Sequence, residues 1–189
     1  MTLVEEGLAA MRGCWRLMWR DPLADEDFNL TIEGFWRSFA MVLPLLVLVY
    51  PLFLSDHQFG VEWAKEGEDP PALNLGLDYI YLLAGVVVWP FIAALLAWLL
   101  GTGKNYVRYM IIYNWMGLPA TLLTVIPHLI HLMTGMMQPA FILMQAVFIL
   151  LLYVTWYVAK AGLQTTTPVA VAFLLADSAL SFGLSALMP

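Results

Sequence analysis

Long apolar segments separated by short polar links make up most of this chain. Five of them are predicted to be membrane-spanning helices: residues 39–54, 79–100, 107–133, 139–159 and 168–188. A helix needs about 20 mainly apolar residues to cross roughly 30 Å of hydrocarbon. Only the first segment is short for this task, and residues 29–38 are available to extend it.

The composition of the chain favours the same class of protein. The chain is 62% hydrophobic and 12% charged, whereas a soluble domain averages about 45–50% apolar and about 25% charged residues. We therefore predict an all-α membrane protein with five transmembrane helices and an N-terminal amphipathic interfacial helix. Residues 1–38 would form a cytoplasmic N-terminal segment and residues 39–189 the transmembrane domain, with no stretch left over for a soluble domain.

The basic residues predict how these helices are oriented. Cytoplasmic loops of membrane proteins carry an excess of Lys and Arg. Most of the eight basic residues fall on one side of a five-span chain: Arg12, Arg16, Arg20, Arg37, Lys104, Arg108 and Lys160. Lys65 alone falls on the other side, in an acidic loop. The N-terminus is therefore predicted to be cytoplasmic, and the C-terminus to lie on the outer side.

Residues 2–20 have the pattern of an amphipathic helix. Thr2 and Glu5 have the spacing of a capping box, and Asp21-Pro22 is expected to end the helix. The apolar stripe contains Val4, Leu8, Met11, Trp15, Met18 and the adjacent Trp19, and a separate stripe contains Arg12, Arg16 and Arg20. Such a helix suits the membrane–water interface, so the two tryptophans and three arginines are the predicted interface residues. The alternative is that the helix packs against the rest of the protein.

Several local sequences resemble those of one protein family. They are RLMWRDP at the end of the first helix, GTGKNYVR before the third span, YNWMGLP within it, and WYVAKAGLQTTTP before the last span. Together with the five-span layout, they make the chain similar to the Yip-type family in its bacterial form. The DLYGP-like signature of the eukaryotic members is absent from this sequence. The resemblance implies a five-helix bundle in the bacterial inner membrane that binds partners or organises the membrane, and it brings no catalytic residues.

Asp177 is an acidic residue near the middle of the last predicted span. A central Asp costs about 2.5–3.5 kcal/mol on insertion scales, so its side chain should face protein or water. The polar residues expected near it are Ser178, Ser181, Gln145, Thr121 and Thr124. Three interpretations are open: a carboxyl group that fixes helix register, a proton or cation site in a small transporter, and a contact with a cation of another subunit.

Asn114 lies in the third predicted span, five residues before Pro119. Proline frees the carbonyl group four residues earlier, at Trp115, and a nearby polar side chain can satisfy such a group. We expect Asn114 to stabilise a kink in this way, and a ligand site is the alternative.

Two histidines, His128 and His131, lie near the outer end of the third span, and Met133 follows them. Residues three apart share a helix face, and imidazole with thioether is a ligand set that suits Cu(I). However, HLIHLMTGMM has no second half at a fixed spacing, and methionine is ordinary packing material. A polar helix end at the interface, without a metal or other cofactor, is the expectation, and a copper site is the alternative.

Other features of the sequence bear on the class of function. The formal net charge is -6, so no basic stripe is available to neutralise nucleic-acid phosphates. The sequence has no P-loop, GxSxG or HExxH motif, and Asp177, Ser178 and His131 lack the geometry of an intramembrane hydrolase. We therefore expect a non-enzymatic membrane protein that contacts the lipid bilayer and binds other membrane proteins or itself. The alternatives are a small transporter or a proton- or cation-conducting protein that uses Asp177, and a structural subunit of a larger membrane complex.

Overall fold

The computed structural model describes residues 2–64, 69 and 72–187. Within these ranges the chain forms helices and no strand, which confirms the all-α prediction. The elements are α1 (Leu3–Met18), η1 (Ala24–Asp27), α2 (Ile32–Ser38), η2 (Phe39–Met41), α3 (Val42–Leu48), α4 (Tyr50–Trp63), α5 (Leu75–Leu99), η3 (Gly103–Asn105), α6 (Tyr106–Thr134), α7 (Met137–Gly162) and α8 (Thr167–Ser185). Lys65, two acidic residues of the same loop (Glu66 and Glu68) and Met188 lie outside the described residues.

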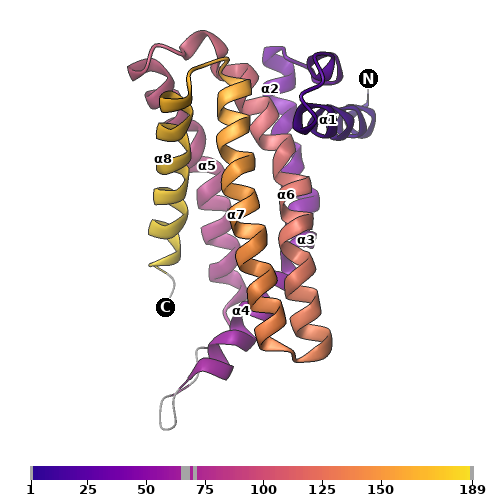
Figure 1. Cartoon of the computed structure of the whole chain (residues 1–189), viewed down its shortest axis with the longest axis vertical. Coiled ribbons are helices and arrows are strands. Elements are labelled where there is room, and N and C mark those ends of the chain that lie inside the picture. Colours follow the sequence, from indigo (N-terminus) through magenta and orange to yellow (C-terminus); the bar gives the residue numbers. More distant parts are fainter. Residues whose placement is uncertain (1, 65–68, 70–71, 188–189) are drawn as a thin grey trace.

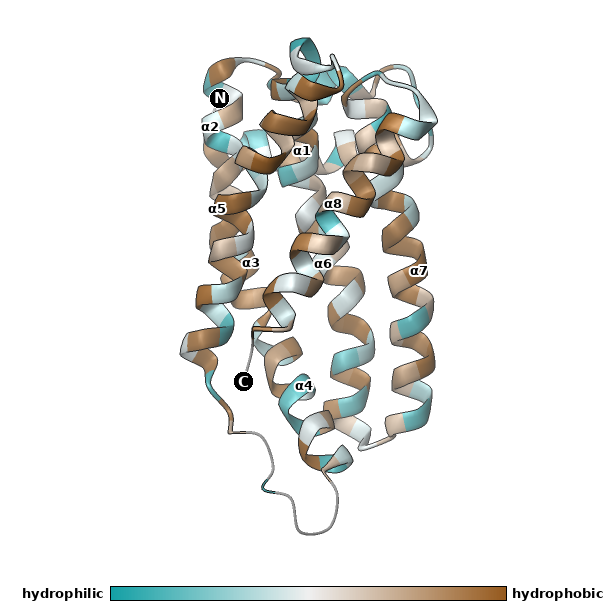
Figure 2. Ribbon diagram, turned by 90° about the vertical axis from the view of Figure 1, so that its left-hand side faces the viewer, coloured by the Kyte–Doolittle hydropathy of each residue, from teal (hydrophilic) through white to brown (hydrophobic). Residues whose placement is uncertain are grey.

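The long helices run along the long axis of the molecule, and α1 lies across one end of them (Figure 1). Four segments are long and apolar enough to cross a membrane, namely α5, η3 with α6, α7 and α8. A fifth span results if residues 32–48 and α4 together form one broken span. Apolar residues follow much of the length of α5 and α7 (Figure 2). The chain therefore has four or five candidate membrane spans.

The first predicted span, residues 39–54, is longer and bent in the structure. Helical turns extend from Ile32 to Trp63, with a bend of 47° between α3 and α4. Pro51 lies in the first turn of α4, where its missing N–H costs no hydrogen bond. The same residue cannot donate to a carbonyl of α3, so the helix does not continue straight through it. The other four predicted spans coincide with α5–α8 to within a few residues at each end.

Helix α6 is the centre of the bundle and packs against α7, α4, α1, α2 and α3. Its residues Tyr109, Met110, Ile111 and Ile112 are fully buried. Gly162 of α7 lies so close to this helix that an added Cβ would be 3.0 Å from the Tyr109 Cα. Small residues at such contacts allow membrane helices to pack backbone against backbone.

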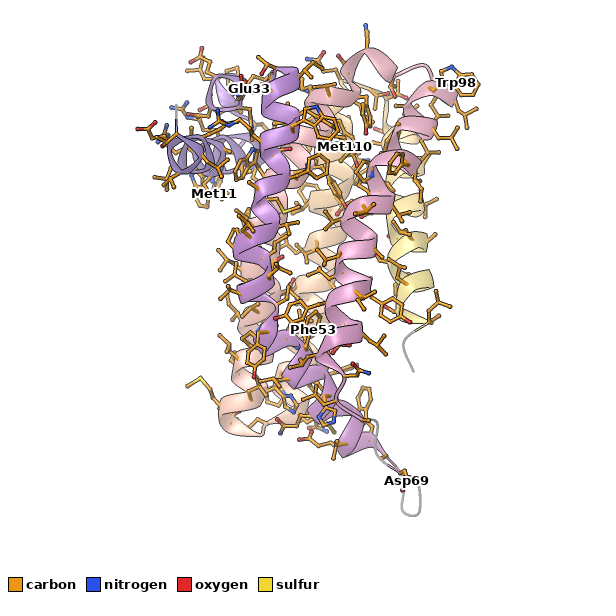
Figure 3. The ribbon with its side chains drawn as sticks, turned by 180° about the vertical axis from the view of Figure 1, so that it is seen from behind. Met11, Glu33, Phe53, Asp69, Trp98 and Met110 are labelled. Carbon is orange, nitrogen blue, oxygen red and sulfur yellow. The ribbon has the colours of Figure 1, made fainter. Side chains whose placement is uncertain are left out.

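The helix α1, the α5–α6 link and the end of α7 lie at the same end of the bundle. Asn105 of η3 donates from Nδ2 to the carbonyl oxygen of Leu163 at 2.7 Å, which ties the link to the end of α7. Glu33 and Trp98 lie at this end of the molecule, and Asp69 lies at the other (Figure 3). The basic residues of these elements are therefore gathered at one end of the bundle.

Candidate functional site

Helix α1 begins at the capping box that the sequence predicted. The backbone N–H of Thr2 donates to Glu5 Oε2 at 2.7 Å, and the backbone N–H of Glu5 donates to Thr2 Oγ1 at 3.2 Å. The bonds from Thr2, chiefly that of its backbone N–H, lower the pKa of the Glu5 carboxyl because they favour the charged form. Local sequence therefore sets where the helix starts.

The two faces of α1 differ in side-chain size and burial. The buried residues are Glu6, Ala9, Ala10, Gly13, Cys14 and Leu17. Small side chains on this face bring α1 close to the bundle. On the opposite face, Val4, Leu8, Trp15 and Trp19 are between 60% and 72% exposed. A group of large apolar side chains left this exposed is typical of a surface that contacts a membrane or a protein partner.

Cys14 lies on the buried face of α1 and is 2% exposed. Burial raises the pKa of its thiol to about 12, because an apolar environment disfavours the thiolate. The thiol is therefore neutral and shielded while α1 is docked, and its reactivity reports on the docking of this helix.

Two of the three arginines predicted as one stripe share a partner, and the third has another. Arg16 Nη1 lies 2.8 Å from Asp27 Oδ2, and Arg12 Nε lies 3.4 Å from Asp27 Oδ1. Arg20 follows the end of α1 with a φ of 59°, and its Nη2 donates to the hydroxyl of Tyr153 on α7 at 3.4 Å. Two arginines thus hold the acidic η1 segment, and the third reaches the bundle.

A buried ion pair fastens α1 to α2. Glu6 is 1% exposed, and its Oε2 lies 2.8 Å from Nε of Arg37. The side chain of Asn29 also donates to Glu6 Oε1, at 3.2 Å. A buried carboxylate needs such partners, since an unpaired one is strongly destabilising.

A second ion pair fastens η1 to α6 and α7. Arg108 donates from Nη2 to Asp25 Oδ1 at 2.7 Å and from Nε to Asp25 Oδ2 at 3.1 Å. Its Nη1 also donates to the carbonyl oxygens of Ala161 and Gly162, at the C-terminal end of α7. A guanidinium group suits this position because the last carbonyls of a helix carry partial negative charge.

Four tryptophans are exposed at the α1 end of the bundle. Trp15, Trp19, Trp36 and Trp98 are each between 68% and 74% exposed. Tryptophan is enriched where a membrane meets water, because its ring is apolar and its N–H is polar. The level of these side chains marks a candidate interface that includes the outer face of α1.

Asp177 of α8 pairs with Tyr113 of α6. The Tyr113 hydroxyl donates to Asp177 Oδ1 at 2.7 Å, in place of the expected Thr121, Thr124 or Gln145. Thr124 donates to the carbonyl of its own helix, and Gln145 is exposed on α7. The difference has a physical reason: the long tyrosine side chain reaches Asp177 from a position nearer the α1 end of the bundle.

The other predicted polar residues are not gathered around Asp177. Ser178 is partly exposed and Ser181 is exposed, along the surface of α8. Asn114 is 2% exposed and donates from Nδ2 to Ser38 Oγ at 2.8 Å. The Asn114 amide therefore joins α6 to α2, whereas the sequence suggested that it would serve the backbone near Pro119.

His131 is fully buried, so the expectation of a polar helix end was wrong for this residue. The reason is that α4 folds over the end of α6: Phe59 stacks on the imidazole ring, with ring centres 3.7 Å apart. Ser55 Oγ lies 2.9 Å from His131 Nδ1, and Glu62 Oε2 lies 3.2 Å from Nε2. Ser55, His131 and Glu62 thus contact one another in the order serine, histidine, carboxylate, as the residues of a hydrolytic triad do. However, Ser55 is also fully buried, so the arrangement is a clamp between α4 and α6.

The histidine pair and Met133 are not assembled as a copper site. His128 Nδ1 lies 3.4 Å from Asp56 Oδ1, whereas the Met133 side chain is 83% exposed. Among the described residues, no three His, Cys, Asp or Glu side chains are placed to hold a metal ion. Both histidines instead contact side chains of α4.

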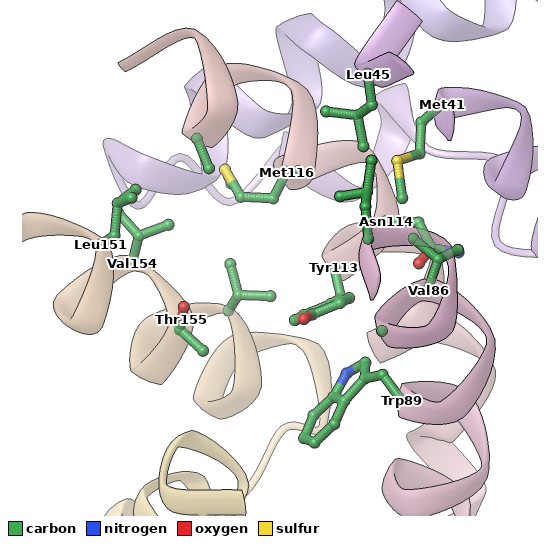
Figure 4. A pocket seen from close by; sticks show the side chains of 15 residues that line it. Met41, Leu45, Val86, Trp89, Tyr113, Asn114, Met116, Leu151, Val154 and Thr155 are labelled. Carbon is green, nitrogen blue, oxygen red and sulfur yellow. The ribbon is translucent and has the colours of Figure 1, made fainter. Parts of the chain in front are cut away.

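A cleft of about 280 Å³ lies between α3, α5, α6 and α7 (Figure 4). Its lining is mostly apolar and includes Met41, Leu45, Val86, Met116 and Val154. Four lining residues carry polar groups: Trp89, Tyr113, Asn114 and Thr155. An apolar cavity with a few polar groups is the usual composition of a site for a small molecule.

Sequence reasoning missed Tyr113, Glu6 and the ion pair between Arg108 and Asp25. One feature could have identified Glu6: it shares a helix face with Ala9, Ala10 and Gly13, and a small-residue face is a packing face. The partners of Arg108 are 83 residues away and more than 50 residues away, so no local pattern indicates them.

These observations define a class of protein. An all-helical chain with four or five helices of membrane-spanning length and composition is compatible with a multi-pass membrane protein. Comparison with protein-family models, with curated proteins and with solved structures gives no match for this chain.

Proposed function

We propose that the chain is a multi-pass protein of the bacterial inner membrane, similar to the Yip type, whose helix α1 lies in the cytoplasmic leaflet. In this proposal the protein is not an enzyme. It organises the surrounding bilayer and offers a surface to other membrane proteins or to another copy of itself. The observation that carries the proposal is the exposed apolar face of α1, on a helix that two ion-pair networks hold in place.

The docking of α1 decides which way its apolar face points. Glu6 with Arg37 and Asp25 with Arg108 attach α1 and η1 to the bundle, so this face cannot turn inward. Covering a large apolar side chain stabilises by about 1.5–3 kcal/mol, which is a strong reason for α1 to meet hydrocarbon or a partner. The exposed tryptophans at the same end of the bundle favour lipid as the cover.

The basic residues support the proposed orientation. Arg12, Arg37, Arg108 and Lys160 belong to elements at the α1 end, and this end is cytoplasmic if the excess of Lys and Arg marks the inner side. Anionic lipids of a cytoplasmic leaflet would attract the same residues.

A helix embedded in one leaflet provides a mechanism for organising the bilayer. It occupies area in that leaflet and none in the other, so the bilayer bends or its lipids rearrange. Binding of such helices depends on curvature and lipid composition. The rigid attachment of α1 to the spans would transmit this effect from the protein to the membrane.

The proposal is tested by reconstituting the full chain into vesicles at increasing protein-to-lipid ratios and measuring their diameters by cryo-electron microscopy. The wild type should narrow or tubulate the vesicles. The double variant Trp15→Ser and Trp19→Ser should leave their diameters near those of protein-free vesicles. The matched control is Trp63→Ser, because Trp63 is also exposed but belongs to α4. If the double variant deforms vesicles as the wild type does, α1 does not act as proposed.

A transporter is the second candidate, and one observation favours it. Asp177 accepts a hydrogen bond from Tyr113, which lines the cleft, so an acidic group lies directly behind the wall of this cleft. A transporter should lose transport with Asp177→Asn while it stays folded. A carboxyl group that only fixes helix register should tolerate Asn in part and lose stability with Leu. A structural subunit of a larger complex would instead co-purify with a stoichiometric partner.

A further inference from the structure

Two basic side chains lie on one aromatic stripe near the C-terminal end of α7. One face of this helix presents four side chains at spacings of three or four residues: Tyr153, Trp156, Tyr157 and Lys160. The ring centres of Tyr153 and Tyr157 are 6.1 Å apart, and the ring of Trp156 lies beside both. Lys160 Nζ lies 5.1 Å from the ring centre of Trp156. The guanidinium carbon of Arg20, which directly follows α1, lies 5.6 Å from the ring centre of Tyr157, so aromatic faces hold both cations on one surface.

These two cations have no carboxylate to neutralise them in the described part of the chain. Four other basic residues form ion pairs with carboxylates, namely Arg12, Arg16, Arg37 and Arg108. Neither Arg20 nor Lys160 forms such a pair with a described residue. Asp21 follows Arg20 in the sequence, but its carboxylate lies 3.7 Å from Arg16 and accepts from the backbone N–H of Leu23. The surface therefore carries two uncompensated positive charges, which attract an anion.

Both cations retain hydrogen-bond donors for that anion. Lys160 Nζ donates to Thr167 Oγ1 at 3.2 Å, and Arg20 Nη2 donates to the Tyr153 hydroxyl at 3.4 Å. Ammonium and guanidinium groups have several N–H donors each, so further donors remain on both side chains. Arg20 is exposed and Lys160 is half-buried, which leaves this surface accessible from outside the bundle. Phosphate oxygens are strong acceptors for such charged donors.

The stripe runs from the end of the bundle toward its middle. Lys160 lies two residues before the end of α7 at Gly162. Tyr153 precedes Lys160 by seven residues, which corresponds to about 10 Å along the helix, and its side chain is 41% exposed. Tyrosine and tryptophan rings suit the level of lipid headgroups. A headgroup at Lys160 therefore has an aromatic and then an apolar surface below it, along which acyl chains can lie.

We propose that this surface binds an anionic phospholipid, whose headgroup pairs with Arg20 and Lys160 and whose acyl chains lie along α7. A zwitterionic phospholipid has the same phosphate, but its own ammonium group neutralises the charge, so the surface selects lipids of net negative charge. Because Arg20 follows α1, the bound lipid would also link α1 to α7. The site rests on the proposed function in one respect: the α1 end must face a leaflet that contains anionic lipid.

The test titrates the purified full chain in detergent micelles with dioleoylphosphatidylglycerol and, separately, with dioleoylphosphatidylcholine, and counts bound lipid by native mass spectrometry. The wild type should bind the first phosphatidylglycerol at least about fivefold more tightly than phosphatidylcholine. Arg20→Gly and Lys160→Gln should each weaken phosphatidylglycerol binding about fivefold and leave phosphatidylcholine binding unchanged. Glycine suits position 20 because the φ there is 59°, so this variant introduces no backbone strain.

A matched control removes a basic residue elsewhere at the same end of the bundle. Lys104→Gln changes an exposed lysine of η3, and should bind both lipids as the wild type does. Alkylation of Cys14 is measured on the same variants, because slow labelling shows that α1 is still docked. If Arg20→Gly labels faster, Lys160→Gln decides the test, since Lys160 belongs to α7.

Three results would overturn the proposal. They are equal affinity of the wild type for the two lipids, weakening by Lys104→Gln as large as that by Lys160→Gln, and displacement of phosphatidylglycerol by excess inorganic phosphate, which would assign the surface to a soluble anion. Failure here is distinct from failure of the proposed function. Vesicle deformation without lipid selectivity would refute this site alone, and lipid selectivity without deformation would refute the bilayer-organising role alone.

Discussion

Removing the charge of Arg37 should release α1 from the bundle. The informative variant is Arg37→Met, which retains a long side chain but leaves the carboxylate of Glu6 without its ion pair. Breaking one side of a buried pair costs about 3–5 kcal/mol. Here the cost should be smaller, because the Arg37 side chain is 28% exposed and Asn29 still donates to Glu6. We expect the undocking of α1 to become easier by about 2 kcal/mol, below the range for fully buried pairs.

The single cysteine of the chain makes this change measurable. Cys14 is shielded on the buried face of α1, and burial raises the pKa of its thiol to about 12. Alkylation at pH 8 therefore requires undocking, and its rate follows the population of the undocked state. A change of about 2 kcal/mol corresponds to roughly 30-fold faster labelling, which mass spectrometry of the intact chain over time would record.

Two variants separate this cause from general damage. Glu33→Gln removes the exposed partner of Arg37 on the same helix, and should change the rate little because such pairs contribute about 0.3–0.5 kcal/mol. The double variant Glu6→Met and Arg37→Met should recover slow labelling, since no unpaired charge is then buried. If Arg37→Met labels at the wild-type rate, the ion pair does not hold α1 in place.

Other contacts lead to three more predictions. Above pH 9 the docked α1 should lose stability by up to about 1.4 kcal/mol per pH unit. The reason is that the Cys14 thiol of the unfolded chain loses its proton near the ordinary cysteine pKa of 9.0, while the buried thiol keeps its proton to about pH 12. Cys14→Ala should remove this pH dependence when unfolding is measured over a series of pH values. Tyr113→Phe should destabilise the bundle by about 1–3 kcal/mol, because Asp177 loses its hydrogen-bond donor. If the two residues act as a pair, the loss of stability in the double variant Asp177→Asn with Tyr113→Phe should differ from the sum of the losses in the two single variants. Ser55→Ala and Glu62→Gln should each speed hydrogen exchange in α4 and leave exchange in α1 unchanged, because both residues hold α4 to the buried His131. Equal exchange in the wild type and in both variants would contradict the clamp.

The spans and the start of α1 could be predicted because each depends on adjacent residues. Apolar length locates α5–α8, and the spacing of Thr2 and Glu5 locates the capping box. Of the apolar stripe predicted for this helix, Trp15 and Trp19 are exposed, whereas Met11 and Met18 pack against the core. Such features need no knowledge of which helices meet.

The tertiary partners could not be predicted, because they depend on how distant segments are arranged. His131 is buried because α4 bends over the end of α6. The spacing of residues in the sequence does not indicate the direction of that bend. Asp177 accepts a hydrogen bond from Tyr113 because the tyrosine side chain is long. Matching residues by their depth in the membrane alone had indicated partners closer to the middle of α6. The cleft likewise depends on side chains from four separate helices.

The central claim is that the outer face of α1 lies in the membrane, and a depth measurement tests it most directly. An environment-sensitive fluorophore would be attached at Leu8→Cys, Trp15→Cys or, as a control, Glu26→Cys, each in a Cys14→Ala background in reconstituted vesicles. Glu26 is exposed in η1, away from the apolar stripe. The account predicts that lipids brominated on their acyl chains quench the probes at positions 8 and 15 and leave the probe at 26 unquenched. Equal, weak quenching at all three positions would show that α1 lies in water and would contradict the account.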